Sequence, residues 1–203
     1  MRGLTTAESA DDLEALRSGL GVARLTFLAG SYGTHLALAA VARHPELVDR
    51  MALLGVEGAD DTFKLPSRVY RVLEVIAEPK RASLPDGVRR IVGRLRPEPA
   101  RLTFSTGQEI VLGEWDMRRW VAESLDTVSE IDTMIAAIPA MLDGQFATLA
   151  QWALRYRLSR PINLMNLAMD CASYATPGRL ARIRSESSTV VLGDVMNFPL
   201  PDV

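Results

Sequence analysis

Histidine and cysteine are scarce in this 203-residue sequence, which contains two histidines and a single cysteine. One cysteine excludes an intramolecular disulfide, and we interpret Cys171 as a small buried helix residue rather than as a nucleophile. Two histidines and one cysteine also provide too few ligands for a transition-metal cluster, so we expect no metal site.

Lysine is scarce as well, since it occurs only at positions 64 and 80, and the formal net charge is −2. A chain with this balance has no basic field to attract nucleic acid or an anionic membrane surface. No apolar run approaches the length of a transmembrane helix. Residues 1–3 lead directly into a helix cap, which predicts that no signal peptide is present and that the location is cytoplasmic.

A strand, a turn of small residues and a helix follow one another around Ser31. Residues 24–29 are nearly continuous in apolar character, Gly30 and Gly33 flank the serine, and an Ala/Leu-rich segment continues to about residue 43. This order is typical of a nucleophile elbow, in which a strained serine projects from a strand-to-helix turn. Positions two before and two after such a serine must be small, because strand and helix approach closely there. Here they are Ala29, where the usual pattern has glycine, and Gly33.

Two other interpretations are possible. Residues 29–33 could form a glycine turn with no catalytic role, or the nucleophile could lie in the second Ser-x-Gly sequence, at Ser105. The second sequence follows the bulky Thr103, and its alternating flanks predict a hairpin over residues 102–112 with Gly107 at the turn. The sequence therefore favours Ser31.

Several segments resemble one enzyme family. Residues 5–17, 29–38, 44–50, 55–58 and 192–202 are similar to α/β-hydrolases of the proline iminopeptidase and tripeptidyl-aminopeptidase-like group. The resemblance implies an α/β fold and acyl transfer on a peptide or small-molecule substrate, with Ser31 as the nucleophile and the Tyr32 N–H as one oxyanion-hole donor. It implies no cofactor, and it leaves the oligomeric state open.

The predicted organisation has three parts. Residues 1–58 form a partial α/β-hydrolase core, residues 59–190 a mostly helical cap or lid, and residues 191–203 the start of a return to the core. The core is one right-handed βαβ unit with two apolar strands at 24–29 and 51–56, and the first is expected to be a parallel strand covered on both faces.

A helix with a capping box precedes the first strand of this core. The box consists of Thr5 and Glu8. Leu13, Leu16 and Leu20 line one face of the helix, and Gly19 and Gly21 end it.

The cap is predicted to be helical, with the hairpin as its only β structure. We predict helices at 66–78, 85–96, 115–126, 129–142, 144–158 and 161–173, and we leave the short apolar run 189–192 unassigned. Large apolar side chains of this region would either line a substrate pocket or fill the helix interfaces of the cap itself. They are Trp115, Trp120, Trp152, Met141, Met165 and Met169.

The other members of a catalytic triad are harder to place. A hydrolase of this fold has its acid and then its histidine after the serine in the chain. Only His35 and His44 follow Ser31, the first within the next helix and the second about 18 Å along it at 1.5 Å per residue. We predict that neither is the base, and that they are a packed helix residue and a surface helix stop.

The acid and the second oxyanion donor are also unassigned. Glu57, Asp60 and Asp61 follow the second strand, where some lipase-like hydrolases place their acid, and the alternative is a solvated loop. The second donor would come from a loop before residue 1. Three functions therefore stay open: a proline iminopeptidase-like serine hydrolase, a cap-bearing esterase or lipase, and a truncated, non-catalytic fragment of such a hydrolase.

Overall fold

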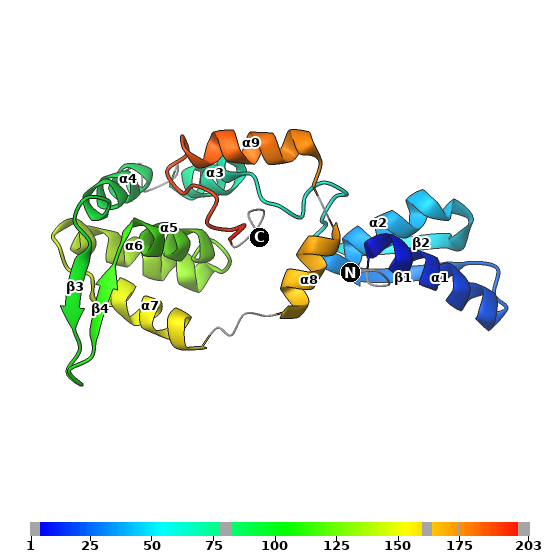
Figure 1. Cartoon of the computed structure of the whole chain (residues 1–203), viewed down its shortest axis with the longest axis horizontal. Coiled ribbons are helices and arrows are strands. Elements are labelled where there is room, and N and C mark those ends of the chain that lie inside the picture. The colour runs from blue at the N-terminus through cyan, green and yellow to red at the C-terminus, as the bar shows by residue number, and fades with distance from the viewer. Residues whose placement is uncertain (1–4, 78–82, 160–163, 174, 199–203) are drawn as a thin grey trace. The chain divides into compact units, whose positions relative to one another are not determined.

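The computed structural model describes residues 5–77, 83–159, 164–173 and 175–198. The chain forms two compact units (Figure 1): unit 1 comprises residues 1–63 and 162–179, and unit 2 comprises residues 64–161 and 180–203. These units divide the chain at other positions than the predicted boundaries at 58 and 190. The assignment of residues 59–190 to a cap stays a prediction.

Unit 1 is a βαβ unit preceded by one helix and completed by another from later in the chain. Its elements are α1 (Thr6–Leu20), β1 (Leu25–Gly30), α2 (Tyr32–Arg43), the 3-10 turn η1 (Pro45–Leu47), β2 (Val48–Leu54) and α8 (Leu164–Ser173). The two strands pair in parallel, from Leu25 beside Val48 to Gly30 beside Leu54. The predicted βαβ arrangement is therefore confirmed.

The start of α1 agrees with the capping box predicted from the sequence. The Thr5 hydroxyl accepts from the Glu8 N–H at 3.2 Å, and the Glu8 carboxylate accepts from the Thr5 N–H at 2.9 Å. The helix ends at Gly21, whose φ of 67° is left-handed, whereas Gly19 lies inside the helix. The second strand begins three residues earlier than predicted, because η1 buries Leu47 completely and leads straight into it.

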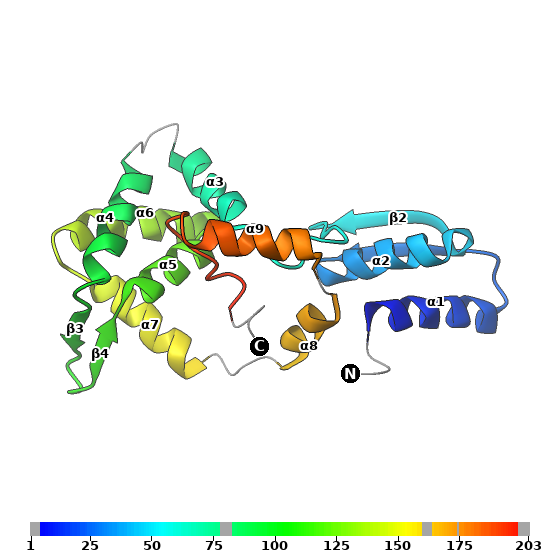
Figure 2. The same ribbon diagram turned by 45° about the horizontal axis from the view of Figure 1, so that its top comes forward.

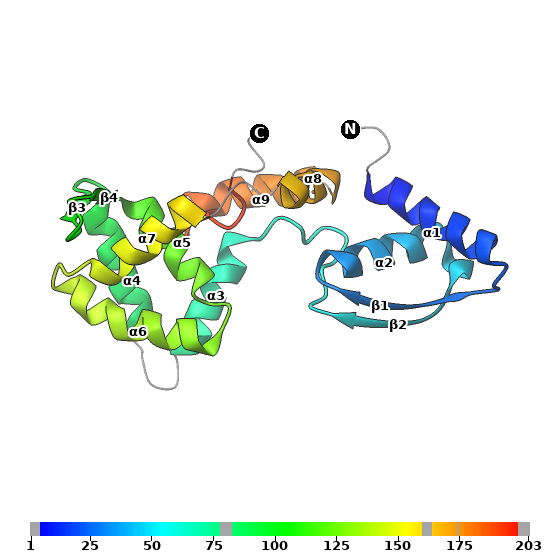
Figure 3. The same cartoon turned by 90° about the horizontal axis from the view of Figure 1, so that it is seen from below.

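One face of the two-stranded sheet carries α1 and α2 (Figure 3). On the other face Leu28 is 79% exposed and Leu54 is 64% exposed. The prediction that the first strand is covered on both faces is therefore wrong for the described residues, because both helices lie on the same side. The predicted apolar face of α1 is also only partly right, since Leu16 and Leu20 are exposed.

Unit 2 is mostly helical, and the described elements agree with the predicted ones to within a few residues at each end. They are α3 (Pro66–Ala77), α4 (Leu84–Leu95), β3 (Ala100–Thr103), β4 (Glu109–Leu112), α5 (Glu114–Glu123), α6 (Val128–Leu142) and α7 (Ala147–Ser159). The two strands form the predicted hairpin, with Gly107 at φ 82° in its turn. The hairpin lies against α5 and α7 (Figure 2).

A further helix, α9 (Pro177–Ser187), was not predicted. Its first three residues belong to unit 1 and the rest to unit 2. A signal was present in the sequence: Thr176 precedes a proline at the first helical position, and its hydroxyl accepts from the Arg179 N–H at 3.2 Å.

The large apolar side chains of unit 2 mainly fill helix interfaces. Trp120 is 3% exposed and Met141 is fully buried in the core. Trp115 and Trp152 are half-buried against the same core, and both lie against Tyr156. For these four the interface interpretation is confirmed.

The other residues that the sequence analysis singled out lie in unit 1 and near the end of unit 2. Met169 is half-buried on α8 of unit 1, and the side chain of Met165 lies outside the described part of the chain. Cys171 is on the predicted helix but is half-buried rather than buried. Residues 189–192 form turns, and Leu192 and Val195 pack into the core of unit 2.

Candidate functional site

Ser31 has a strained backbone at the junction of β1 and α2. Its φ is 50° and its ψ is −129°, and it is the one non-glycine residue with positive φ in the described part of the chain. Its N–H donates to the Leu54 carbonyl at 3.0 Å, so the β1–β2 pairing continues into the turn. A non-glycine residue in such a conformation costs on the order of 1–3 kcal/mol, and residues of this kind cluster at functional sites.

The small residues that flank Ser31 lie where strand and helix meet. A Cβ built on Gly33 would be 3.7 Å from the Ala29 Cβ, which is ordinary van der Waals contact. The alanine that replaces the usual glycine therefore has room here, and a Cβ at position 33 would not clash with it. The turn has the strained geometry that the sequence predicts, and the chemical role of Ser31 stays a prediction.

Thr34 holds this turn in place. It is fully buried, and its hydroxyl donates to the Ser31 carbonyl at 2.7 Å and accepts from the Glu57 N–H at 2.8 Å. One side chain thus joins the start of α2 to the loop that follows β2. Sequence reasoning missed Thr34, although a threonine in the first turn of a helix is a frequent partner of local backbone groups.

The Ser31 side chain is accessible to a substrate from solvent. The residue is exposed, and its hydroxyl has no hydrogen-bond partner among the residues that the structure describes. Tyr32 is the first residue of α2, so its N–H has no acceptor within the helix and lies at the positive end of the helix dipole. Its phenol oxygen is 3.1 Å from the Thr6 hydroxyl, and its ring stacks on His35. A backbone donor at a helix N-terminus suits a developing oxyanion.

Both histidines make hydrogen bonds elsewhere. His35 is 5% exposed, and its Nδ1 lies 3.1 Å from the Gly58 carbonyl oxygen. His44 Nε2 lies 2.8 Å from a carboxylate oxygen of Asp11. No hydrogen bond in the described structure joins either ring to Ser31. These contacts agree with the predictions for both histidines.

The acidic residues after β2 are held by hydrogen bonds or an ion pair with other parts of unit 1. Asp60 accepts from both the N–H and the hydroxyl of Thr176, each at 2.7 Å, and these bonds hold the pKa of its carboxyl below the usual value. Asp61 is exposed and pairs with Arg179 at 2.8 Å. Glu57 is attached through its backbone to Thr34. A role for any of the three as the catalytic acid stays a prediction.

Asp11 ties α1 to the end of α2 through hydrogen bonds with Arg43 and His44. The hydrogen bonds from Arg43, and then from His44, lower the pKa of Asp11 from 3.8 to about 2. A carboxyl with a lowered pKa in the folded state stabilises the fold above its unfolded pKa and loses that effect as the pH falls through the folded value.

We therefore expect the stability of unit 1 to decline between about pH 4 and pH 2. Urea denaturation at several pH values, followed by amide exchange in α1 and α2, measures this decline. The variant Asp11→Asn should lack this part of the pH dependence. Asp12→Asn, at the exposed neighbour on the same helix, should keep it. An identical acid response of wild type and Asp11→Asn would refute the assignment.

Comparison with protein families gives a match over most of the chain. A family model described as "alpha/beta hydrolase fold" matches residues 2–175. It does not separate the proline iminopeptidase-like group from other members of that fold family. No curated protein matches the chain.

The described residues contain neither a helix that could cross a membrane nor a group of side chains that could hold a metal ion. No helix there has both the length and the apolar character to cross a membrane. Nor does that part of the chain bring three or more His, Cys, Asp or Glu side chains together in a way that could hold a metal ion.

Proposed function

Because the chain belongs to the α/β hydrolase fold family, we propose that it acts in hydrolysis by acyl transfer, with Ser31 as the nucleophile. The single observation that carries this proposal is the backbone of Ser31, with φ 50° and ψ −129° at an exposed strand-to-helix turn. A glycine turn without chemistry would not need a serine in a conformation that disfavours side chains.

The proposed chemistry follows from the groups around the turn. The Ser31 oxygen attacks the substrate carbonyl, and the Tyr32 N–H donates to the oxygen that becomes negatively charged. The leaving amine or alcohol departs with a proton, and an acyl ester remains on Ser31. Water then hydrolyses that ester and restores the hydroxyl. No step calls for a metal or an organic cofactor.

A proton acceptor is needed for the first step, since a free hydroxyl is a poor nucleophile at neutral pH. The contacts of His35 with Gly58 and of His44 with Asp11 favour a second candidate for these 203 residues by themselves: a chain that presents the nucleophile but does not turn over. The two candidates share the role of Ser31 and differ in whether a base acts on it.

We propose a peptide or small-molecule substrate, with aminopeptidase activity of the proline iminopeptidase type as the first choice. The resemblance of residues 5–17, 29–38 and 44–50 supports this choice. Esterases and lipases with a cap share the same elbow, and the fold by itself does not distinguish an ester from an amide substrate. The helical unit 2 would be the cap.

Two cysteine variants test the role of Ser31, because a thiolate can react without a general base. We compare Ser31→Cys with Ser105→Cys, both in a Cys171→Ala background and both at exposed positions. A thiol at a helix N-terminus has a lowered pKa, so Ser31→Cys should react with p-nitrophenyl acetate at least about 10 times faster. The rate of nitrophenol release and the mass of the acylated peptide measure this. Equal rates at the two positions would refute the proposal.

A further inference from the structure

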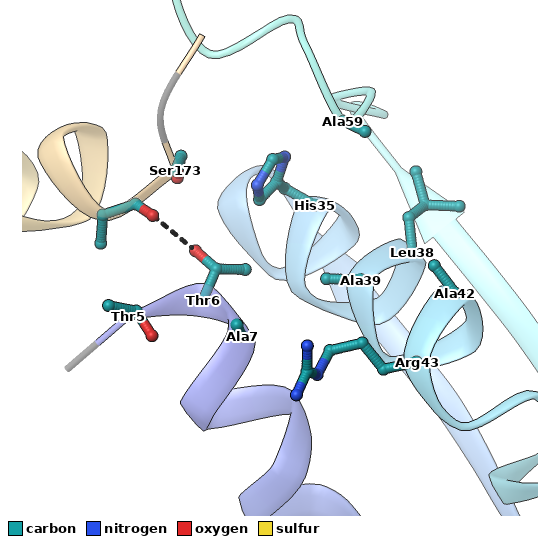
Figure 4. A pocket seen from close by; sticks show the side chains of 11 residues that line it. Thr5, Thr6, Ala7, His35, Leu38, Ala39, Ala42, Arg43, Ala59 and Ser173 are labelled. Carbon is teal, nitrogen blue, oxygen red and sulfur yellow. Dashed lines mark hydrogen bonds between the residues drawn. The ribbon is translucent and has the colours of Figure 1, made fainter. Parts of the chain in front are cut away.

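Unit 1 contains a cavity of about 500 Å³ between the N-terminus of α1, one side of α2 and the end of α8 (Figure 4). It is open to solvent on one side, and ligand pockets measure roughly 300–1,000 Å³. The cavity is thus as large as a small-molecule site. Its lining includes Thr6, His35, Ala42, Arg43, Ala172 and Ser173.

Most of this lining is apolar, and the positive charge of Arg43 is neutralised by Asp11. Arg43 is the one residue of the lining with a permanent charge, and its guanidinium donates to both carboxylate oxygens of Asp11 at 2.9 and 2.7 Å. Thr6 already contacts the Tyr32 hydroxyl and the Ala172 carbonyl. An ionic ligand would therefore find no free opposite charge in the cavity.

The imidazole of His35 provides an acceptor. Its Nδ1 must carry a proton, because its partner, the Gly58 carbonyl, can only accept. In the neutral ring the other nitrogen, Nε2, is then an acceptor, and it has no partner among the described residues. The residue as a whole is 5% exposed, and its ring lines the cavity together with Ser173 and Ala59 (Figure 4). Nε2 is not one of the buried polar atoms without a partner in the described structure, so a ligand with a donor would compete with water for this acceptor.

We propose that this cavity binds a small uncharged organic molecule with an apolar body and one hydroxyl or N–H group that donates to His35 Nε2. The apolar wall selects the body of the ligand, and the single acceptor selects its orientation. The site is separate from the elbow chemistry, because Ser31 does not line the cavity.

Phenol and toluene are suitable probes, because they have nearly the same shape and only phenol has a donor. Each is titrated into the full chain carrying isotope-labelled histidine, and the nuclear magnetic resonance signals of the His35 ring are followed. Phenol should give a saturable shift at Nε2, with an affinity at least about 10-fold higher than that of toluene, which corresponds to one hydrogen bond. Equal affinities would refute the donor, and no saturable shift with either probe would refute the site.

Two variants at the cavity make this test specific. In His35→Asn the amide nitrogen takes the place of Nδ1 and can still donate to Gly58, but Nε2 is gone. Phenol should then bind no more tightly than toluene, as followed by ligand-observed resonance. Ala42→Leu should fill part of the cavity and weaken both probes. Unchanged phenol binding in either variant contradicts the proposal.

Ser31→Ala separates this inference from the proposed function. It should leave the phenol titration as in wild type, whatever the outcome of the acylation test. A loss of phenol binding in this variant would place the ligand at the elbow instead.

Discussion

Replacing Thr34 by valine is expected to destabilise unit 1 by about 1–3 kcal/mol, because a buried hydroxyl that bridges two backbone groups is lost. Valine has the shape of threonine, so packing at this fully buried position is kept. The substitution removes the donor to the Ser31 carbonyl and the acceptor of the Glu57 N–H. Amide hydrogen exchange in β1 and α2 measures the loss directly in unit 1.

The same substitution should also affect the elbow. Without the hydrogen bond from the Thr34 hydroxyl, residue 31 can leave its strained conformation. The ratio of the acylation rate of Ser31→Cys to that of Ser105→Cys should then fall. Thr26→Val, at an exposed position of β1, is the matched control and should change stability by less than about 0.5 kcal/mol. If Thr34→Val exchanged as slowly as Thr26→Val, Thr34 would not be what holds the turn.

Local features of unit 1 could be predicted well from the sequence. The bounds of α2, Tyr32 to Arg43, agree with the predicted segment, because a strained small-residue turn begins the helix and the residue before Pro45 cannot continue it. The Thr5–Glu8 capping box is likewise a relation between neighbours in the chain. Each of these depends on a few consecutive residues, so the pattern contains all the necessary information.

Contacts between distant residues could not be predicted. Thr34 meets Glu57, and His35 meets Gly58, only after β2 has paired with β1. The exposure of Leu28 and Leu54 was missed for the same reason. An apolar strand sequence is compatible with burial on both faces, but it does not say which elements cover those faces. The helix α9 was missed because its arginines and serines give no apolar period.

Our central proposal is that Ser31 is the nucleophile and that, in these 203 residues by themselves, neither His35 nor His44 activates it. The claim has a chemical consequence that differs from the behaviour of a complete serine hydrolase. A positioned general base contributes roughly 10²–10⁴-fold to such a reaction, so its absence should be visible in the reactivity of the hydroxyl.

Labelling with a fluorophosphonate tests this claim most directly. At neutral pH the wild-type chain should label no faster than Ser31→Ala. Added imidazole, as an external base, should accelerate labelling of the wild type at Ser31 and leave Ser31→Ala unchanged. Rapid labelling of the wild type without imidazole, abolished by Ser31→Ala, would show that a base within the chain reaches Ser31 and would contradict the account.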